Sequence, residues 1–150
     1  HVGDAGASAL AAALGRGALP QLKVLNLQRN FIGNAGLVAL APALRRLPAL
    51  EDIVLWGNPF GDEGLAALVA PPPPAGAPSP PKGGLTQLEK LDLDLTQITV
   101  AGCATLASAL DSGRLPALKI INLDEAPAAS AAAKAAVHRA LDESRSLFYA

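Results

Sequence analysis

The chain has 150 residues, 51% of them hydrophobic, and a formal net charge of −1. This length and composition suffice for one core, so a single domain over residues 1–150 is predicted. The near-neutral charge argues against a nucleic acid as the main partner, because basic surfaces hold phosphate backbones. No stretch approaches about 18 uninterrupted apolar residues, so no membrane span is expected.

The single cysteine, Cys103, excludes an internal disulfide and fits a reducing compartment, so a cytoplasmic location is predicted. The charged residues are unevenly distributed along the chain. Residues 1–50 carry a net charge of +4 and residues 51–150 a net charge of −5, counting Lys and Arg against Asp and Glu. The two ends of the molecule are therefore expected to present opposite signs.

Residues 1–21 open with the block Val2-Gly-Asp-Ala-Gly6-Ala-Ser-Ala-Leu10, which has counterparts further along the chain. No strand pattern precedes this block, so residues 1–21 are interpreted as a partial repeat and the chain as a piece of a longer protein. Without a covering element, Ala9, Leu10 and Leu14 would be poorly buried. Upstream repeats or a partner are therefore expected at this end.

Four segments then share one leucine frame, with repeats starting at residues 22, 50, 88 and 118. They read Leu22-Lys-Val-Leu25-Asn-Leu27-Gln-Arg-Asn30, Leu50-Glu-Asp-Ile53-Val-Leu55-Trp-Gly-Asn58, Leu88-Glu-Lys-Leu91-Asp-Leu93-Asp-Leu-Thr96 and Leu118-Lys-Ile-Ile121-Asn-Leu123-Asp-Glu-Ala126. The alternation around Leu25 and Leu27 places the leucines on the inner face of a short strand and their neighbours on the outer face. Four such strands at this spacing indicate a solenoid.

A second block follows three of these frames. It reads Ile32-Gly-Asn-Ala-Gly36-Leu-Val-Ala-Leu40, Phe60-Gly-Asp-Glu-Gly64-Leu-Ala-Ala-Leu68 and Ile98-Thr-Val-Ala-Gly102-Cys-Ala-Thr-Leu106. Apolar positions three or four apart predict a helix after each strand. The recurrent glycines Gly33, Gly36, Gly61 and Gly64 indicate turns and close packing, because a phosphate-binding loop would follow one strand only.

The interval between the second and third frames is about ten residues longer than the others, and a proline-rich insertion over residues 71–84 accounts for it. Prolines at this density cannot continue a helix, so the helix should end after Leu68 and an exposed extended loop should follow. The loop is interpreted as a tolerated connection. The alternatives are a ligand for an SH3-like or profilin-like partner, and docking onto the same protein.

A last helix is predicted over about residues 128–145, because Pro127 suits a first helical turn and an alanine-rich run follows. Val137, Leu141 and Phe148 share one face, so this helix is expected to close the core. The terminal Leu147-Phe148-Tyr149 is a concentrated apolar tip. It is expected to pack on the last coil or to anchor a partner.

The frames and the glycine-containing blocks resemble the leucine-rich repeat family, in its long-repeat, ribonuclease-inhibitor-like subclass. The resemblance implies an α/β fold, a right-handed solenoid with a parallel sheet on the concave side and helices on the convex side. It also implies that Asn30 and Asn58 form a structural ladder of hydrogen bonds between turns. The equivalent positions are Thr96 and Ala126, so the ladder is expected to weaken toward the C-terminus.

Candidate binding residues lie at outward positions of the frames or in the turns after them. They are Arg29, Trp56, Lys90, Asp92, Asp94, Asp124 and Glu125. Trp56 is either a binding anchor or a cover for strand neighbours such as Val54. Asp94 and Asp124 fall on adjacent strands, and solvent, Lys90, a basic partner or a divalent cation could relieve their repulsion.

No catalytic, cofactor or metal-binding residue is predicted. His138 is interpreted as a solvated or helix-pairing side chain and Cys103 as a small buried residue, and no metal-ligand spacing is present. The predicted function is a non-enzymatic scaffold that binds a protein through the concave sheet. The alternatives are a small-GTPase regulator resembling the Ran GTPase-activating protein, the sensing domain of a NOD-like receptor, and an adaptor subunit of a cytoskeletal or ciliary assembly.

Overall fold

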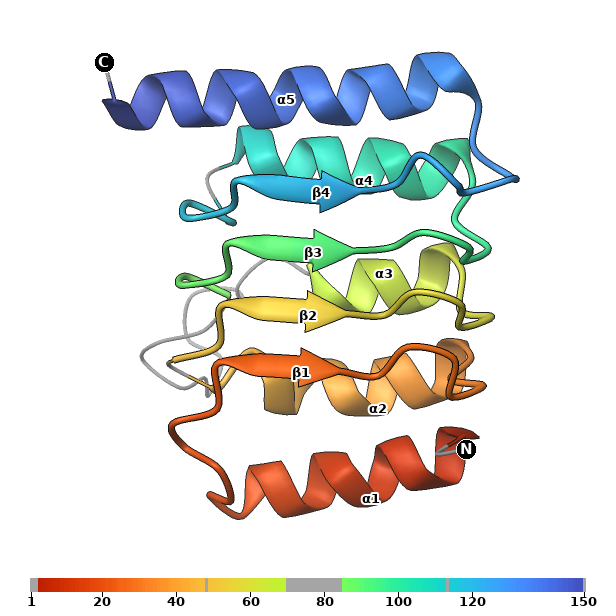
Figure 1. The fold of residues 1–150 in the computed structure, drawn as a ribbon, viewed down its shortest axis with the longest axis vertical. Helices are drawn as coiled ribbons and strands as arrows, with labels where there is room; N and C mark the ends of the chain where they lie inside the picture. The colour runs from red at the N-terminus through yellow and green to blue at the C-terminus, as the bar shows by residue number, and fades with distance from the viewer. Residues whose placement is uncertain (1–2, 48, 70–84, 113, 150) are drawn as a thin grey trace, which may run out of the picture.

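The computed structural model describes residues 3–47, 49–69, 85–112 and 114–149, with side chains as far as residue 144. Helices and strands alternate along these residues (Figure 1). The elements are α1 (Gly3–Gly15), β1 (Val24–Asn26), α2 (Asn34–Leu44), β2 (Asp52–Val54), α3 (Asp62–Leu68), β3 (Lys90–Asp92), α4 (Val100–Asp111), β4 (Ile120–Asn122) and α5 (Ala131–Tyr149). Each strand falls inside a predicted leucine frame. None of the helices in the described part is long and apolar enough to cross a membrane.

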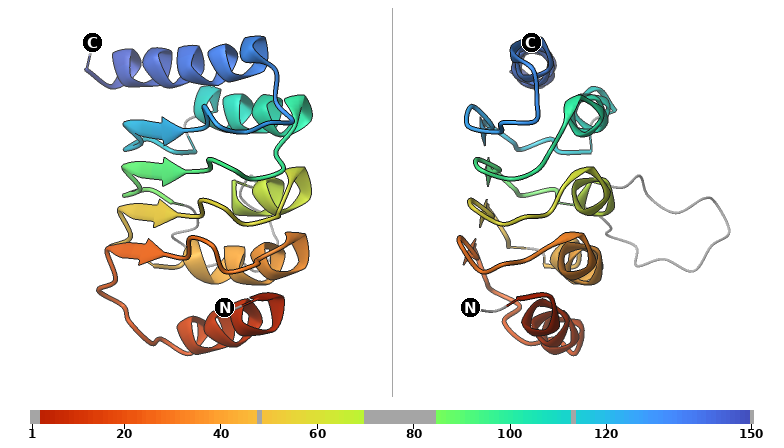
Figure 2. Two further views of the ribbon diagram at one scale, coloured as in Figure 1. Left: turned by 45° about the vertical axis from the view of Figure 1, so that its right-hand side comes forward. Right: turned by 90° about the vertical axis from the view of Figure 1, so that its right-hand side faces the viewer.

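The four strands form one parallel sheet in the order β1-β2-β3-β4. The frames are in register, so that Leu25 pairs with Ile53, Ile53 with Leu91, and Leu91 with Ile121. The strands lie on one side of the stack, and helices α2, α3 and α4 lie behind them (Figure 2). The predicted α/β repeat with a parallel sheet is therefore confirmed.

The core consists of leucine layers contributed by successive coils. Ile53 and Leu91 are fully buried, whereas Leu25, which holds the same register position in the first coil, is only partly buried. Inner leucines have a neighbouring coil on both sides, and each contributes on the order of 2 kcal/mol by burial. Repetition of leucine and isoleucine thus builds a core without many aromatic residues.

Asn58 joins the first and second coils through its buried amide. Its Nδ2 donates to the carbonyl oxygens of Leu27 (2.8 Å) and Leu55 (2.9 Å), and its Oδ1 accepts from the backbone N–H groups of Asn30 and Ile32, both at 3.0 Å. The Thr96 hydroxyl donates only to Leu93 in its own coil, at 2.7 Å. The side-chain link between coils at this frame position is therefore made by Asn58 and not by Thr96.

A second ladder, the capping ladder of Asp4, Asn34 and Asp62, runs along the helix starts. Asn34 Oδ1 accepts the N–H groups of Gly61 (2.8 Å) and Gly64 (2.9 Å) in the following coil. Asp4 does the same for Gly33 and Gly36, and Asp62 accepts the N–H and the hydroxyl of Thr99. Each coil therefore satisfies free N–H groups at the start of the next helix.

The capping ladder explains why the second block repeats a glycine. A Cβ at Gly102 would lie 2.2 Å from Asp62 Oδ1, and one at Gly36 would lie 2.4 Å from Asp4 Oδ1. Real Cβ atoms do not approach oxygen so closely, so a side chain there would push the coils apart. This supports the interpretation of these glycines as close-packing residues.

The last helix begins later than predicted. Pro127 lies in a turn, and α5 starts at Ala131, where the hydroxyl oxygen of Ser130 accepts the N–H of Ala133 at 3.1 Å. A serine cap thus sets the start in place of the proline. The helix reaches Tyr149 rather than residue 145, and Val137 and Leu141 are buried, as expected of a helix that closes the core.

The expectation that Leu14 is poorly covered was wrong, because Leu14 is only 5% exposed. Ala9 is exposed and Leu10 partly buried. Helix α3 ends at Leu68, as predicted, and the Arg114 guanidinium donates to the Val69 carbonyl just beyond that end, at 2.8 Å. The proline-rich loop at 71–84 and the side chains of the terminal apolar tip lie outside the described residues.

A candidate protein-binding surface on the strands

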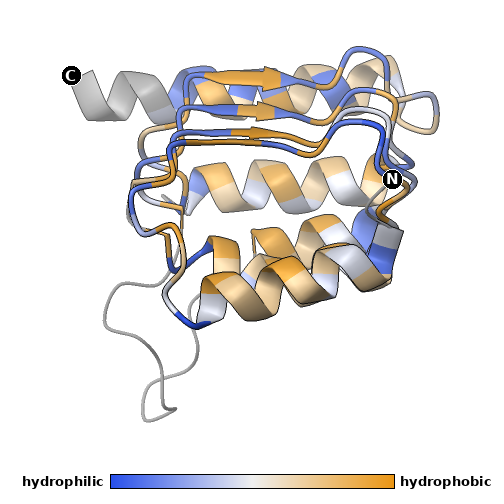
Figure 3. Ribbon diagram, turned by 60° about the horizontal axis from the view of Figure 1, so that its bottom comes forward, coloured by the Kyte–Doolittle hydropathy of each residue, from blue (hydrophilic) through white to orange (hydrophobic). Residues whose placement is uncertain are grey.

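The strand face is defined here as the outward side of β1–β4 together with the turn residues that follow each strand. The turns are largely hydrophilic, while the strands and helices are largely hydrophobic (Figure 3). The outward position next to the turn carries Asn26, Val54, Asp92 and Asn122 in register. All seven candidate binding residues lie in these strands or turns.

Arg29 lies over the ring of Trp56, with its guanidinium carbon 4.4 Å from the ring centre. The Arg29 N–H also donates to the Trp56 carbonyl oxygen at 2.9 Å. The side-chain stem crosses Gly57, where a Cβ would lie 3.0 Å from Arg29 Cγ. The predicted neighbours thus form a stacked cation–π pair between the first two coils, with Trp56 partly buried and Arg29 exposed.

Asp92 and Asp94 each accept a backbone hydrogen bond. Asp92 Oδ1 accepts the N–H of Asp94 at 3.2 Å, as Asn26 Oδ1 accepts the N–H of Gln28 at 3.1 Å. Asp94 Oδ1 accepts the N–H of Glu125 at 3.0 Å and thereby links the third and fourth coils. Both carboxylates therefore have a structural role in the turns, and both residues are partly buried.

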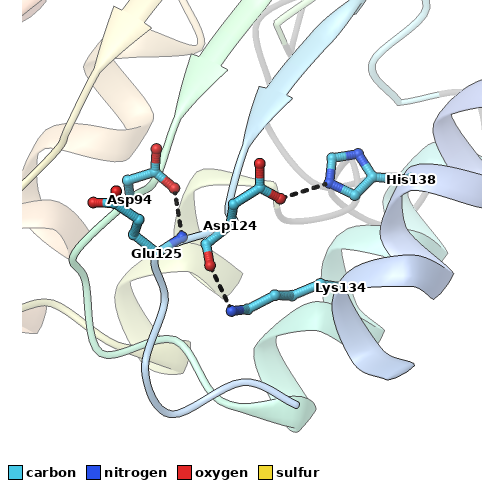
Figure 4. A network of polar contacts seen from close by, with 5 residues as sticks. All are labelled: Asp94, Asp124, Glu125, Lys134 and His138. Atoms are coloured by element: carbon cyan, nitrogen blue, oxygen red, sulfur yellow. Dashed lines mark hydrogen bonds and ion pairs between the residues drawn. The ribbon is translucent and has the colours of Figure 1, made fainter. Parts of the chain in front are cut away.

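The carboxylate of Asp124 faces helix α5 (Figure 4). Its Oδ1 lies 3.6 Å from His138 Nε2, and Lys134 Nζ donates to the Asp124 carbonyl oxygen at 2.7 Å. The Asp124 side chain is nevertheless 86% exposed, and Glu125 is also exposed. The acidic cluster is defined as Asp92, Asp94, Asp124 and Glu125, at the end of β3 and in the turns after β3 and β4. Helix α5 partly balances its charge at Asp124.

Lys90 stands at the start of β3, two residues before Asp92 on the same face, and it pairs in register with Asp52 and Ile120. In the described part of the chain its ammonium makes no ion pair with the acidic cluster. The charge of Asp94 and Asp124 is relieved instead by the Glu125 N–H and by α5. The sequence predicted the last helix but not its contact with Asp124, because the helix follows the strands without belonging to a frame.

Four exposed apolar side chains on this surface were not selected from the sequence. Val24 (56% exposed) and Ile120 (50%) occupy the ends of the register row that contains Asp52 and Lys90. Phe31 and Leu95 project from turns with positive φ. The sequence could have indicated Val24 and Ile120, because these apolar residues occupy an outward frame position at which Asp52 and Lys90 carry charges in the other coils.

Neither Cys103 nor the acidic side chains of the described residues form a reactive or metal-binding site. Burial raises the pKa of the Cys103 thiol, and the nearby Asp62 carboxylate raises it further, although Lys134 opposes the shift. A protonated, 2% exposed thiol behaves as a small apolar residue. Among the described residues no three His, Cys, Asp or Glu side chains are grouped so that they could hold a metal ion.

Comparison with known sequences and structures agrees with the repeat architecture. The family profile described as "Leucine Rich repeat" matches residues 19–41. Ribonuclease inhibitor of Sus scrofa is 36% identical over 105 residues, which are 69% of this chain and 21% of that protein. Protein NLRC5 of Mus musculus is 37% identical over 105 residues, which are 69% of this chain and 5% of that protein.

The chain belongs to the leucine-rich repeat family, in its ribonuclease-inhibitor-like class. This leucine-rich repeat chain thus spans about a fifth of the length of porcine ribonuclease inhibitor. A solved structure titled "Leiomodin-1 Actin-Binding Site 2 (ABS2)" is similar with a TM-score of 0.61 and 16% identity, over 93% of this chain and 89% of that one. That likeness concerns the fold alone.

Proposed function

We propose that this chain is a non-enzymatic scaffold that binds a protein partner through the strand face, which forms the concave side of a right-handed solenoid. One observation carries the proposal: Arg29 stacked on Trp56 stands next to the acidic cluster on a face that no described element covers. Arginine and tryptophan are the residues most often found at the centres of protein interfaces.

The surface is held in place before any partner binds. The backbone of Arg29 is tied to Trp56, and Asp94 is tied to Glu125 in the next coil. A prearranged surface loses little side-chain freedom on binding, so more of the contact energy becomes affinity. Acidic side chains beside the stack disfavour a nucleic acid and complement the basic groups of a protein partner.

The family supports the same class of function. Porcine ribonuclease inhibitor, by its name, acts on an enzyme, and an enzyme is a protein partner. The proposal includes a cytoplasmic location, and it includes further repeats or a partner that cover Ala9 and Leu10 at the N-terminal end. Repeat stacks require such a cover at each open end.

The test places a photo-cross-linking residue at Gln28, beside Trp56 on the strand face, and in a matched variant at Val38 on the outside of α2, which is 38% exposed. Each variant of the whole protein is irradiated in cells. Cross-links to one protein from position 28 and not from position 38 support the proposal. Cross-links from position 38 alone would assign binding to the helices.

A further inference from the structure

The strand face carries two opposite charges in a fixed order, and this order defines what can lie across it. We propose that it recognises an extended peptide segment that crosses the strands, with a carboxylate at one position bound by Arg29 and a basic residue two to four positions away bound by the acidic cluster. This inference rests on the proposed function and adds the chemistry of the partner to it.

Arg29 is suited to receive an anion. Its φ of 54°, its backbone hydrogen bond and its stack on Trp56 hold the side chain in one direction. Stacking occupies the face of the guanidinium and leaves its N–H edges, which make no hydrogen bond with any other described residue. A planar fork of N–H donors matches the two oxygens of a carboxylate.

The acidic cluster is suited to receive a cation. One oxygen of Asp94 accepts the Glu125 N–H, while its other oxygen makes no hydrogen bond within the described chain. The Asp124 carboxylate is 86% exposed, and its nearest basic group, His138, stands at 3.6 Å. An ammonium or guanidinium from a partner therefore meets carboxylates that are held in position and still accessible.

The spacing of the strands fixes the spacing of the charges in the segment. Neighbouring strands lie about 4.8 Å apart, so the step from the second to the fourth coil is about 10 Å. An extended segment advances about 3.3 Å per residue and alternates its faces, so positions i, i+2 and i+4 point toward the sheet. The Arg29 guanidinium lies over Trp56 in the second coil, so Asp94 and Asp124 are about 5 and 10 Å away across the sheet. An acid at i over Arg29 places i+2, about 6.6 Å on, between Asp94 and Asp124, and i+4, about 13 Å on, just beyond Asp124. A long basic side chain reaches the acidic cluster from either position.

Apolar side chains stand between and beside the charges. Leu95, 44% exposed, occupies the turn between Gly57 and Glu125, and its N–H donates to the Glu125 carbonyl oxygen. An apolar residue of the segment would cover it. A phosphate suits Arg29 less well than a carboxylate, because its second negative charge would face the acidic cluster one coil away.

The test is a selection of displayed random twelve-residue peptides on the immobilised protein, repeated with Arg29→Gln and with the double variant Asp94→Asn, Asp124→Asn. The native protein should enrich peptides that carry an acid and a base two to four positions apart. Arg29→Gln should abolish the preference for the acid and keep the preference for the base. The double variant should abolish the preference for the base and keep the preference for the acid. Arg46→Gln, an exposed arginine after α2, is the matched control and should change neither preference.

A charge exchange tests the pairing itself. Replacing the acid of a selected peptide by lysine should weaken binding at least tenfold, and Arg29→Glu should restore it. Peptides that depend on Trp56 but bind the native and Arg29→Gln proteins equally would overturn this inference and leave the proposed function intact. If no enriched peptide depends on Trp56 for binding, the recognition of an extended segment is overturned. The cross-linking experiment tests the proposed function separately.

Discussion

The amide of Asn58 donates a hydrogen bond of 2.8 Å to the carbonyl oxygen of Leu27, one coil earlier. The same side chain satisfies the N–H groups of Asn30 and Ile32. Asn58→Ala would leave several buried backbone groups without partners and should lower the free energy of unfolding by about 2–4 kcal/mol. Urea denaturation followed by circular dichroism measures this loss.

Thr96→Val is the matched control, since Thr96 occupies the same frame position in the third coil and is also buried. Its hydroxyl makes one hydrogen bond, within its own coil, so the loss should be about 1 kcal/mol. Equal losses for the two variants would show that Asn58 does not link the coils.

Gly102→Ala tests the close approach of the capping ladder. The new Cβ would lie 2.2 Å from Asp62 Oδ1 and 2.7 Å from Ile98 Cγ2, so the variant should lose about 2–3 kcal/mol. Combining it with Asp62→Ala removes the first of these clashes. The double variant should therefore be more stable than the sum of the two single losses predicts.

Gly15→Ala at the end of α1 is the comparison for that experiment, because nothing lies within 4 Å of its Cβ position. Its stability should stay within about 1 kcal/mol of the native chain or rise slightly, since alanine restricts the unfolded state. Similar destabilisation at Gly15 and Gly102 would contradict the packing explanation.

Cys103 should resist thiol reagents in the folded protein. Burial raises its pKa, so the thiolate is depleted at pH 8, and the side chain is only 2% exposed. Reaction with Ellman's reagent should be slow in buffer and fast in 6 M guanidinium. The protonated thiol stabilises the fold fully below its unfolded pKa, and this contribution falls as pH rises through the folded value. Rapid labelling in buffer would show an open or mobile α4.

Helix α5 should contribute stability through one face. Val137 is fully buried, and Val137→Ala removes buried methyl groups and should cost about 1–2 kcal/mol. Arg139→Ala, two residues further on the exposed side, should change stability by less than about 0.5 kcal/mol. Thermal denaturation of both variants measures the two losses. Equal, small losses would show that α5 does not pack on the core through the face that contains Val137.

The strands and the order of the core were predictable because they depend on a repeated pattern. Leu25, Ile53 and Leu91 hold the same position in three frames and so predict three equivalent strands. Strands with the same frame pair in register in the sheet. The start of α5 was misplaced because a proline and a serine competed for the same role three residues apart. The helix starts after Ser130 because the Ser130 hydroxyl oxygen accepts a backbone N–H group, which the side chain of Pro127 cannot do.

The site was predictable as a set of positions and not as a set of contacts. The frame places Arg29 and Trp56 on adjacent coils, but the stack depends on a left-handed backbone at Arg29 and on the absence of a side chain at Gly57. The capping ladder could not be predicted from the sequence for a similar reason. Asp62 reaches Thr99 across 37 residues, and only the stacking of coils brings the two together.

The central claim, that a protein binds through the strand face, is tested most directly by the affinity of the cross-linked partner measured by calorimetry. Trp56→Ala should weaken binding at least tenfold, while Val38→Ser on α2 should leave the affinity unchanged and both variants should remain folded. Unchanged affinity for Trp56→Ala together with a loss for Val38→Ser would contradict the account and place the binding surface on the helices.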